Sequence, residues 1–155
     1  MRLGDVLRKE RERKHLSVQE LAAALDLRPE EYAALEDGEP LFEEWPPKLG
    51  LCAMALQVPT SRLISSSGKA RDAGKESGQT GRLIRARREQ LGVTEESLAS
   101  RMAISVAQLN TIESGQSPLE RYGILLLRYA EIIEQPIFNF FYPGGIELKR
   151  LADYP

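Results

Sequence analysis

The feature that most constrains this chain is a repeat of its own sequence at a constant offset of 77 residues. Residues 3–64, the first copy, align with residues 80–141, the second copy, without a gap, and twelve of the 62 aligned positions are identical. Eight of the identical pairs are Arg8/Arg85, Arg11/Arg88, Leu21/Leu98, Ala22/Ala99, Glu36/Glu113, Gly38/Gly115, Ala53/Ala130 and Pro59/Pro136. At least nine further pairs, from Val6/Leu83 to Leu63/Phe140, are apolar in both copies. The chain is therefore predicted to contain one fold twice.

The segment between the two copies has the composition of a linker. Residues 65–80 contain no Leu, Ile, Val or aromatic residue and consist mainly of Ser, Gly and charged residues. Because such a segment cannot bury enough surface to offset the entropy lost on ordering, we expect a flexible linker with a root-mean-square span of about 20–25 Å. The predicted organisation is a first domain over residues 1–64, the linker over 65–80, a second domain over 81–142 and a tail over 143–155.

Each copy is predicted to be a small helical bundle, because its apolar residues recur at spacings of three and four. In the first copy, Leu3, Val6 and Leu7 mark a first helix, and Ser17 is placed as the N-cap of a second helix. A third helix ends at Gly38, a typical C-terminal stop. The second copy repeats this pattern with Thr94 as the cap and Gly115 as the stop, and fourth helices are expected over residues 48–57 and 120–134, with short last helices beginning at Pro59 and Pro136.

A family resemblance follows from the turn of about three residues that joins the second and third helices, which has the proportions of a helix-turn-helix. The segment LGVTEESLA at residues 91–99, with Ile104-Ser105 and IESG at residues 112–115, resembles the Cro/C1-type (Xre-like) helix-turn-helix family. Residues 16–22 and 35–38 match the same pattern less fully. The resemblance implies an all-α fold of two tandem five-helix, lambda repressor-like domains. It also implies a DNA-binding transcriptional regulator, since the family consists mainly of such proteins.

Among the charged positions that both copies share, two are candidates for an ion pair. Arg11 and Glu36 recur as Arg88 and Glu113. In the family, residues at these positions form an internal ion pair between the first helix and the end of the third, so the resemblance implies two structural ion pairs here. Removal of one partner would leave a lone buried charge, which is costly. The alternative interpretation is that these residues are unrelated surface charges.

The third helix of this fold lies in the major groove of DNA, where polar side chains reach base edges. In the first copy this helix carries Glu30 and Glu31, and residues 1–64 hold 9 Lys and Arg against 12 Asp and Glu. We therefore expect the first copy to be a poor reader of DNA, since these acids repel phosphate. Acids at a helix start also favour the helix dipole, which explains both glutamates without any function.

The third helix of the second copy is the better candidate, because it has no acid before Glu113. The predicted DNA-contacting residues are Ser105, Val106, Ala107, Gln108, Asn110, Thr111, Gln116, Arg82, Arg85 and Arg101. The polar members can donate and accept hydrogen bonds, and the apolar members can touch thymine methyl groups. One departure is Glu95, which stands where many family members carry a phosphate-contacting glutamine. The alternative is a solvated polar face on a protein-interaction module.

The second copy also carries apolar residues that the shared bundle does not require. Leu125, Leu127, Phe138 and Tyr142 align with Lys48, Gly50, Ser61 and Ser65 of the first part of the chain. Such surplus apolar side chains need a cover. We favour a homodimer, since helix-turn-helix proteins usually read paired half-sites. The alternative is a cover from the tail or from the first copy.

The sequence contains few residues suited to catalysis or metal binding, since it has one Cys and one His. Cys52 aligns with Tyr129 and is expected to be buried, and His15 aligns with Gly92 at a helix end. No phosphate-binding loop and no catalytic set stand out, so we expect neither an enzyme nor a cofactor nor a metal site.

The function predicted from the sequence is that of a sequence-specific regulator that binds double-stranded DNA through its second domain. The first domain is expected to support dimerisation or to bind a protein partner. The alternative, favoured by the net charge of −2, is a protein–protein interaction adaptor that has lost DNA binding. No apolar run approaches the roughly 20 residues of a membrane span, and the start of the chain lacks a signal peptide, so we expect a cytoplasmic protein without membrane contact.

Overall fold

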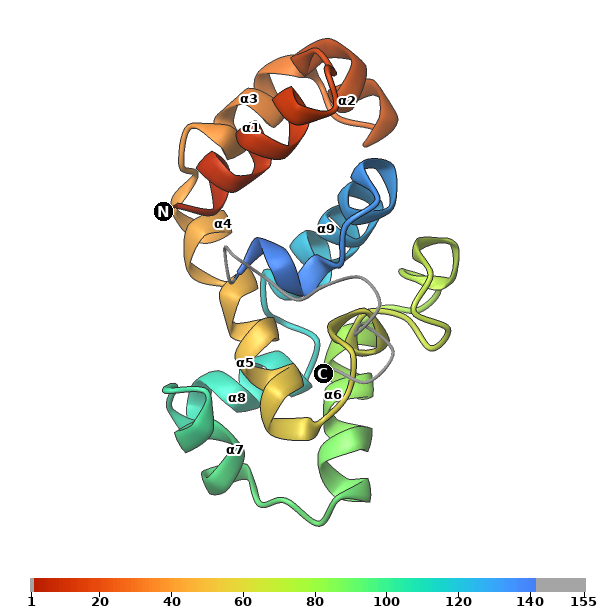
Figure 1. Cartoon of the computed structure of the whole chain (residues 1–155). Coiled ribbons are helices and arrows are strands. Elements are labelled where there is room, and N and C mark those ends of the chain that lie inside the picture. Colours follow the sequence, from red (N-terminus) through yellow and green to blue (C-terminus); the bar gives the residue numbers. More distant parts are fainter. Residues whose placement is uncertain (1, 142–155) are drawn as a thin grey trace.

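The computed structural model describes residues 2–141, and the regular elements among these residues are helices (Figure 1). The first copy forms α1 (Leu3–Arg13), α2 (Val18–Ala24), α3 (Pro29–Glu36), α4 (Pro40–Glu44), α5 (Pro46–Leu56) and the 3-10 turn η1 (Thr60–Leu63). The second copy forms α6 (Gln79–Gln90), α7 (Glu95–Arg101), α8 (Val106–Glu113), α9 (Leu119–Ile133) and η3 (Ile137–Phe140), and η2 (Ala70–Asp72) lies between the copies. Within the described residues the only extended pairing is an isolated bridge, which confirms the predicted all-α class. No helix in residues 2–141 is both long enough and apolar enough to cross a lipid bilayer.

The backbone repeats with the sequence. Residues with positive φ end equivalent helices in the two copies, and the pairs are His15/Gly92, Asp26/Ala103, Gly38/Gly115 and Gln57/Glu134. The predicted N-caps are also equivalent: Ser17 accepts a hydrogen bond from the Glu20 amide, and Thr94 accepts one from the Ser97 amide. The offset of 77 residues therefore describes the local structure as well as the sequence.

The first helix of each copy is pressed against the end of the third helix. A Cβ atom on Gly4 would lie 2.4 Å from the carbonyl oxygen of Leu35, and one on Gly81 would lie 2.3 Å from that of Ile112. These distances are far below any allowed contact, so only glycine fits at both positions. The close approach brings α1 next to Glu36 and α6 next to Glu113.

A pair of carboxylates that the sequence analysis missed holds the same helix starts. Glu43 accepts hydrogen bonds from the amides of Leu3 (2.7 Å) and Gly4 (2.8 Å). Glu120 accepts the equivalent bonds from Thr80 (3.3 Å) and Gly81 (2.9 Å). Both carboxylates satisfy amides that a helix start leaves without a partner. Glu43 and Glu120 are identical residues at the offset of 77, and this identity could have indicated a shared role.

The two copies exchange parts of their last helices, which was not expected from the sequence: α5 packs on the second copy, the end of α9 with η3 packs on the first, and α9 also keeps its packing on α6 of its own copy. α5 of the first copy packs against α6 and α7 of the second copy, and η1 packs against α6. In return η3 packs against α1, and the Tyr129 hydroxyl at the far end of α9 donates to the carbonyl of Leu7. Figure 1 shows α5 beside α6–α8 and the end of α9 below α1–α3. We call α1–α3 with the end of α9 and η3 the upper unit, and α6–α8 with α5 and η1 the lower unit.

Polar contacts secure the exchange at both helix ends. At the end of α5, Arg87 donates to the carbonyls of Leu56 (3.1 Å) and Gln57 (3.3 Å). At the end of α9, Glu134 lies 3.7 Å from the Lys14 ammonium of the first copy. Cations beside helix C-termini satisfy carbonyls and stabilise the helix dipole. The exchange is therefore reciprocal.

The exchange of last helices places the larger aromatic residues together in the core of the upper unit. In the upper unit Tyr32 stacks on Tyr129 with ring centroids 6.5 Å apart, and Tyr129 meets Phe140 edge-on at 5.5 Å. The positions equivalent to Tyr32 and Tyr129 are Leu109 and Cys52, which are fully buried. The two tyrosines thus lie in the upper unit, and their smaller equivalents lie in the lower unit. The predicted burial of Cys52 is confirmed, and it raises the pKa of the thiol far above its ordinary value.

The segment between the copies differs from the expected flexible linker because it makes defined contacts. The Ala70 amide donates to Glu131 of α9 at 2.8 Å, and Gln79 donates to the carbonyl of Asp72 at 3.1 Å. Ala70 and Ala73 pack against the apolar core. The segment has no large apolar residue, and small alanines supply the contact instead. We call residues 65–78 the connector.

The proposed dimer surface is not a surface in this structure. Leu125, Leu127 and Phe138 are 8%, 3% and 5% exposed, because α9 lies between the two units and is covered from both sides. Tyr142 lies outside the described residues. The chain itself therefore covers these three side chains, and the alternative of an internal cover replaces the expected homodimer contact.

Candidate nucleic-acid interface

The candidate reading helix α8 begins with a capping box. The Ser105 hydroxyl accepts a hydrogen bond from the Gln108 amide, and the Gln108 side chain accepts one from the Ser105 amide, both at 3.1 Å. The turn before them contains Ala103 with a φ of 56°, which brings α7 and α8 together at an angle. Two predicted base-contacting residues therefore hold each other and fix the first turn of the helix.

The outer face of α8 is polar and uncharged. Ser105, Ala107, Asn110 and Thr111 are exposed, as is Gln116 beyond the helix end, while Val106 and Gln108 are half-buried. The Thr111 hydroxyl donates to the Ala107 carbonyl at 3.1 Å, so its lone pairs stay available. Within residues 2–141 the Asn110 side chain makes no hydrogen bond, so both its donor and its acceptor are free. The predicted reading residues thus lie together on one helix.

The only acid of α8 is turned into the lower unit. Glu113 accepts hydrogen bonds from Arg88 Nε at 2.7 Å and Nη2 at 2.9 Å, and Arg88 also donates to the carbonyl of Val93. The two side chains are only 9% and 6% exposed. The ion pair expected from the family resemblance is present, and it removes a negative charge from the candidate DNA face.

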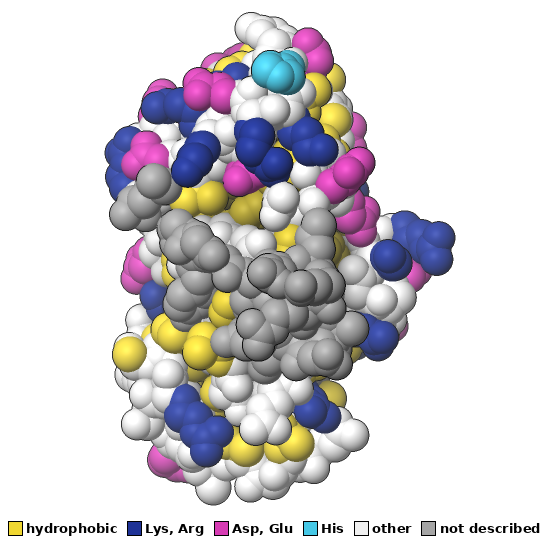
Figure 2. Space-filling view, viewed as in Figure 1, with side chains coloured by type: hydrophobic (Ala, Val, Ile, Leu, Met, Phe, Trp, Pro, Cys, Tyr) yellow, Lys and Arg dark blue, Asp and Glu magenta, His cyan; other side chains and the backbone are white. Residues whose placement is uncertain are grey.

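The cations expected to meet phosphate are already partnered. Arg82 pairs with Glu76, and Arg85 Nε lies 3.0 Å from Glu89. Arg101 donates to the carbonyl of Ala55 at the end of α5. All three arginines are exposed, so they can be reached, but the carboxylates beside Arg82 and Arg85 reduce the local positive charge. Figure 2 likewise shows cations and acids interspersed over the upper unit rather than a broad basic patch on that face.

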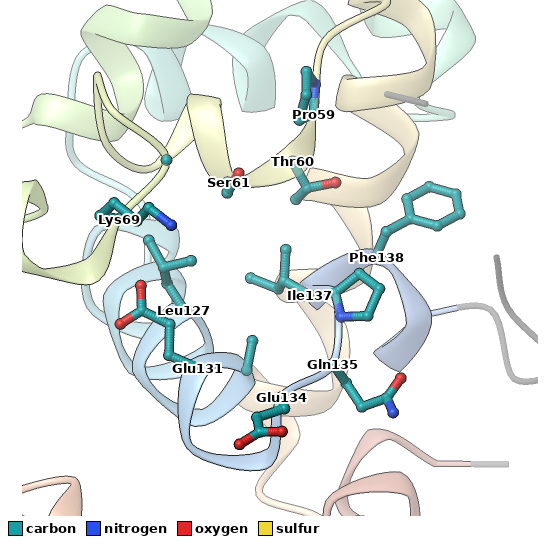
Figure 3. A pocket seen from close by; sticks show the side chains of 13 residues that line it. Pro59, Thr60, Ser61, Lys69, Leu127, Glu131, Glu134, Gln135, Ile137 and Phe138 are labelled. Carbon is teal, nitrogen blue, oxygen red and sulfur yellow. The ribbon is translucent and has the colours of Figure 1, made fainter. Parts of the chain in front are cut away.

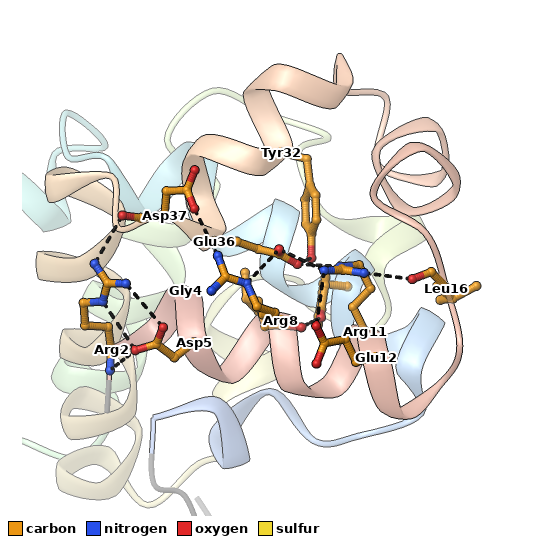
Figure 4. A network of polar contacts seen from close by, with 12 residues as sticks. Arg2, Gly4, Asp5, Arg8, Arg11, Glu12, Leu16, Tyr32, Glu36 and Asp37 are labelled. Atoms are coloured by element: carbon orange, nitrogen blue, oxygen red, sulfur yellow. Dashed lines mark hydrogen bonds and ion pairs between the residues drawn. The ribbon is translucent and has the colours of Figure 1, made fainter.

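The equivalent ion pair of the upper unit belongs to a larger network (Figure 4). Arg11 Nε lies 2.6 Å from Glu36, and Arg11 Nη1 donates to the carbonyl of Leu16. Glu36 also accepts hydrogen bonds from the Tyr32 hydroxyl at 2.7 Å and from Arg8 at 3.4 Å. Burial by itself would raise the pKa of Glu36, but the hydrogen bonds from Arg11 and Tyr32 outweigh burial and hold it below the ordinary value.

We expect this network to make the protein sensitive to acid. Since the pKa of Glu36 is lower in the folded chain than in the unfolded chain, its ionised form stabilises the fold above the ordinary glutamate pKa of about 4.3. That stabilisation is lost as the pH falls through the folded pKa. Glu36→Gln should lower the melting temperature at pH 7 and flatten its fall below pH 4, as measured by circular dichroism. Glu20→Gln, at an exposed position of α2 outside the network, is the control and should leave the profile unchanged.

The third helix of the first copy has no comparable polar face. Arg28 precedes α3 and lies 3.4 Å from Glu30 and 3.0 Å from Glu31. The hydrogen bond from the Arg28 amide, together with that from its side chain, lowers the pKa of Glu31. The first turn of α3 therefore presents two glutamates, and the next exposed helical residue is Ala34.

Across residues 2–141, no three His, Cys, Asp or Glu side chains form a group that could hold a metal ion. Comparisons of the chain with protein-family models, with curated proteins and with solved structures give no match.

Proposed function

We propose that this chain is a sequence-specific DNA-binding regulator of transcription that contacts double-stranded DNA mainly through α8. The observation that carries the proposal is the exposed, acid-free polar face of α8, whose single glutamate is held inside by Arg88. Amide and hydroxyl side chains in such a position form hydrogen bonds to base edges in the major groove. Asn110 and Thr111 are the first candidates for those bonds.

The packing around α8 supports the same proposal. Base reading needs a helix that is held rigidly while its outer face stays free. α8 is anchored by the buried residues Leu109 and Ile112 and is tied to α6 through Arg88. The exposed Arg82 and Arg85 at α6 can exchange their carboxylate partners for phosphate, which makes binding dependent on salt.

A protein–protein adaptor is the rival proposal, and one observation favours it. The exposed arginines near α8 are paired with acids, and α3 presents Glu30 and Glu31, so neither helix lies in a strongly positive field. An adaptor would need no such field, whereas non-specific attraction to DNA depends on it.

A binding selection separates the two proposals. The full chain is incubated with random duplexes at low salt, and the enriched sequence is measured by fluorescence anisotropy. Replacing Asn110 and Thr111 by Ala should weaken binding by about 1–3 kcal/mol for each lost base contact. Gln108 is left intact because its loss would also break the cap at Ser105. Arg85→Ala should weaken binding to every sequence and reduce the salt slope by about one.

The matched control is Glu30→Ala with Glu31→Ala in α3, which should leave specific binding unchanged or slightly tighter. Failure to enrich any sequence at low salt would refute DNA reading and support the adaptor. Equal losses from the α3 and α8 variants would refute the division of roles between the two helices.

A further inference from the structure

We propose that the first copy contributes to DNA reading through α5, and that Arg87 and Arg101 are positioning residues that orient α7 and α8 by holding the end of that helix. The sequence predicted a DNA contact for Arg101, but its hydrogen bond in the structure goes to the carbonyl of Ala55 at the end of α5, at 3.3 Å. This role rests on the proposed function of α8, and it does not require α3 to touch DNA.

The carbonyl of Ala55 lacks a partner within α5 because of the residue four positions later. A helix carbonyl accepts from the amide four residues ahead, but that residue is Pro59, which has no amide hydrogen. Figure 3 shows Pro59 just before η1, where the chain leaves α5 and enters the wall of a cavity of about 470 Å³. Arg101, the last residue of α7, supplies the missing donor.

Arg87 of α6 holds the two carbonyls that follow. Its Nε donates to Leu56 at 3.1 Å and its Nη2 donates to Gln57 at 3.3 Å, while Nη1 donates to the Gln90 side chain and so orients the guanidinium. We call Arg87 and Arg101, with the carbonyls that they bind, the arginine clamp. Because the C-terminus of a helix is its negative end, cations at this place also stabilise α5. The clamp therefore joins α6 and α7 through the end of α5.

The clamp distinguishes the lower unit from the upper one. The residues of the first copy that correspond to Arg87 and Arg101 are Glu10 and Ala24. An ionised glutamate accepts hydrogen bonds but does not donate them, and an alanine side chain does neither, so this pair cannot hold helix carbonyls. The difference marks the unit that contains α8, the candidate reading helix.

α7 depends on α5 for its position. It has only seven residues, of which Leu98 and Ala99 are buried, and its main packing partners are α5 and α8. A helix this short is not stable by itself, so its neighbours decide how it lies. Arg101 stands two residues before Ala103, whose φ of 56° sets the turn into α8. The clamp thus holds α7 directly before the turn that orients the reading helix.

α5 also lies near the far end of α8. Burial, and in addition the charge of Glu113, raises the pKa of the Cys52 thiol, and Glu113 is the last residue of α8. Side chains that recognise a ligand must be held within about 0.5 Å of their productive geometry. A shift of α5 is therefore expected to disturb α8 at both ends, at its start through α7 and at its end beside Cys52.

The single cysteine of the chain provides a test of the clamp that needs no DNA. Because Cys52 is fully buried on α5, it reacts only when α5 opens. Arg87→Ala should raise the rate of its reaction with an aromatic disulfide about tenfold, and Arg101→Ala about threefold, as expected for the loss of two hydrogen bonds and of one. Arg85→Ala, on the same helix as Arg87, is the matched control and should leave the rate unchanged.

DNA binding by the same variants of the full chain tests whether the clamp positions α8. Arg87→Ala and Arg101→Ala should each lower the ratio of specific to non-specific affinity at least about threefold, and they should leave the salt slope unchanged because neither side chain meets phosphate. Arg85→Ala should do the reverse, with a salt slope reduced by about one and an unchanged ratio.

An unchanged rate at Cys52 in both clamp variants would overturn the proposal, since α5 would then be held by other contacts. A salt slope reduced by about one in Arg101→Ala would assign this residue to phosphate instead. If the unsubstituted chain selects a sequence and both clamp variants keep its affinity ratio, only this inference fails. If the unsubstituted chain selects no sequence, the proposed function fails, and the positioning role fails with it.

Discussion

Cut at Gly74 in the connector, the chain should lose its fold in both halves and recover it when the halves are mixed. Fragment 1–73 lacks the end of α9 that covers α1–α3, and fragment 74–155 lacks the α5 that covers α6–α8. Exposing Leu49, Leu56 and Leu63 in this way costs roughly 1.5–3 kcal/mol for each side chain. The sum is comparable with the whole stability of a small domain. Circular dichroism should show low helicity for each fragment and full helicity for an equimolar mixture.

Self-closure of each half is the competing outcome, and the core residues argue against it. If α5 replaced α9 in the upper unit, Cys52 would occupy the place of Tyr129 opposite Tyr32 and leave a cavity. In the lower unit the tyrosine would occupy the place of Cys52 and overpack the core. Two fragments that each melt cooperatively as monomers, near the melting temperature of the intact chain, would disprove the exchange.

Arg88→Ala should cause the largest loss of stability among single arginine substitutions in the second copy. Its guanidinium makes two hydrogen bonds to Glu113 and one to the carbonyl of Val93, and both charged side chains are less than a tenth exposed. Removing the arginine leaves a buried carboxylate without a partner, which costs about 3–5 kcal/mol. Urea unfolding of the full chain, followed by circular dichroism, measures the loss.

Arg85→Ala is the matched control, because Arg85 is on the same helix and also pairs with a glutamate. Its side chain is 62% exposed and Glu89 is 57% exposed, so the pair is screened by water and contributes at most about 1 kcal/mol. Arg88→Lys should fall between the two variants, since lysine keeps the charge but loses the two-point contact. Equal unfolding free energies for Arg88→Ala and Arg85→Ala would show that the buried pair has no special role.

Local structure could be predicted from the sequence because it depends on neighbouring residues. The caps at Ser17 and Thr94, the helix ends at Gly38 and Gly115, and the polar face of α8 follow from patterns within a few positions. The two ion pairs were expected from a family resemblance and are present. The residues expected to read DNA are together on α8, and their role stays a prediction.

The partners of α5 and α9 could not be predicted, because the two copies share one apolar pattern. Either last helix offers leucines at positions that fit either bundle, as Leu49 and its equivalent Leu126 show. Only differences between the copies distinguish the pairings, and these lie in the sizes of Cys52 and Tyr129. Because the exchange was not predicted, Leu125, Leu127 and Phe138 were wrongly expected to form a dimer surface. In the structure they are buried within the chain.

The exchange of last helices also sets the order in which this protein can fold as it leaves the ribosome. α1–α3 is complete at Glu36, but the segment that covers it ends at Phe140, about a hundred residues later. At a synthesis rate of about 5–20 residues per second, the apolar face of α1–α3 stays uncovered for roughly 5–20 s. The lower unit has no such delay, since α5 is already made when α6–α8 emerge. The amino-terminal helices are therefore synthesised first and reach their final packing last.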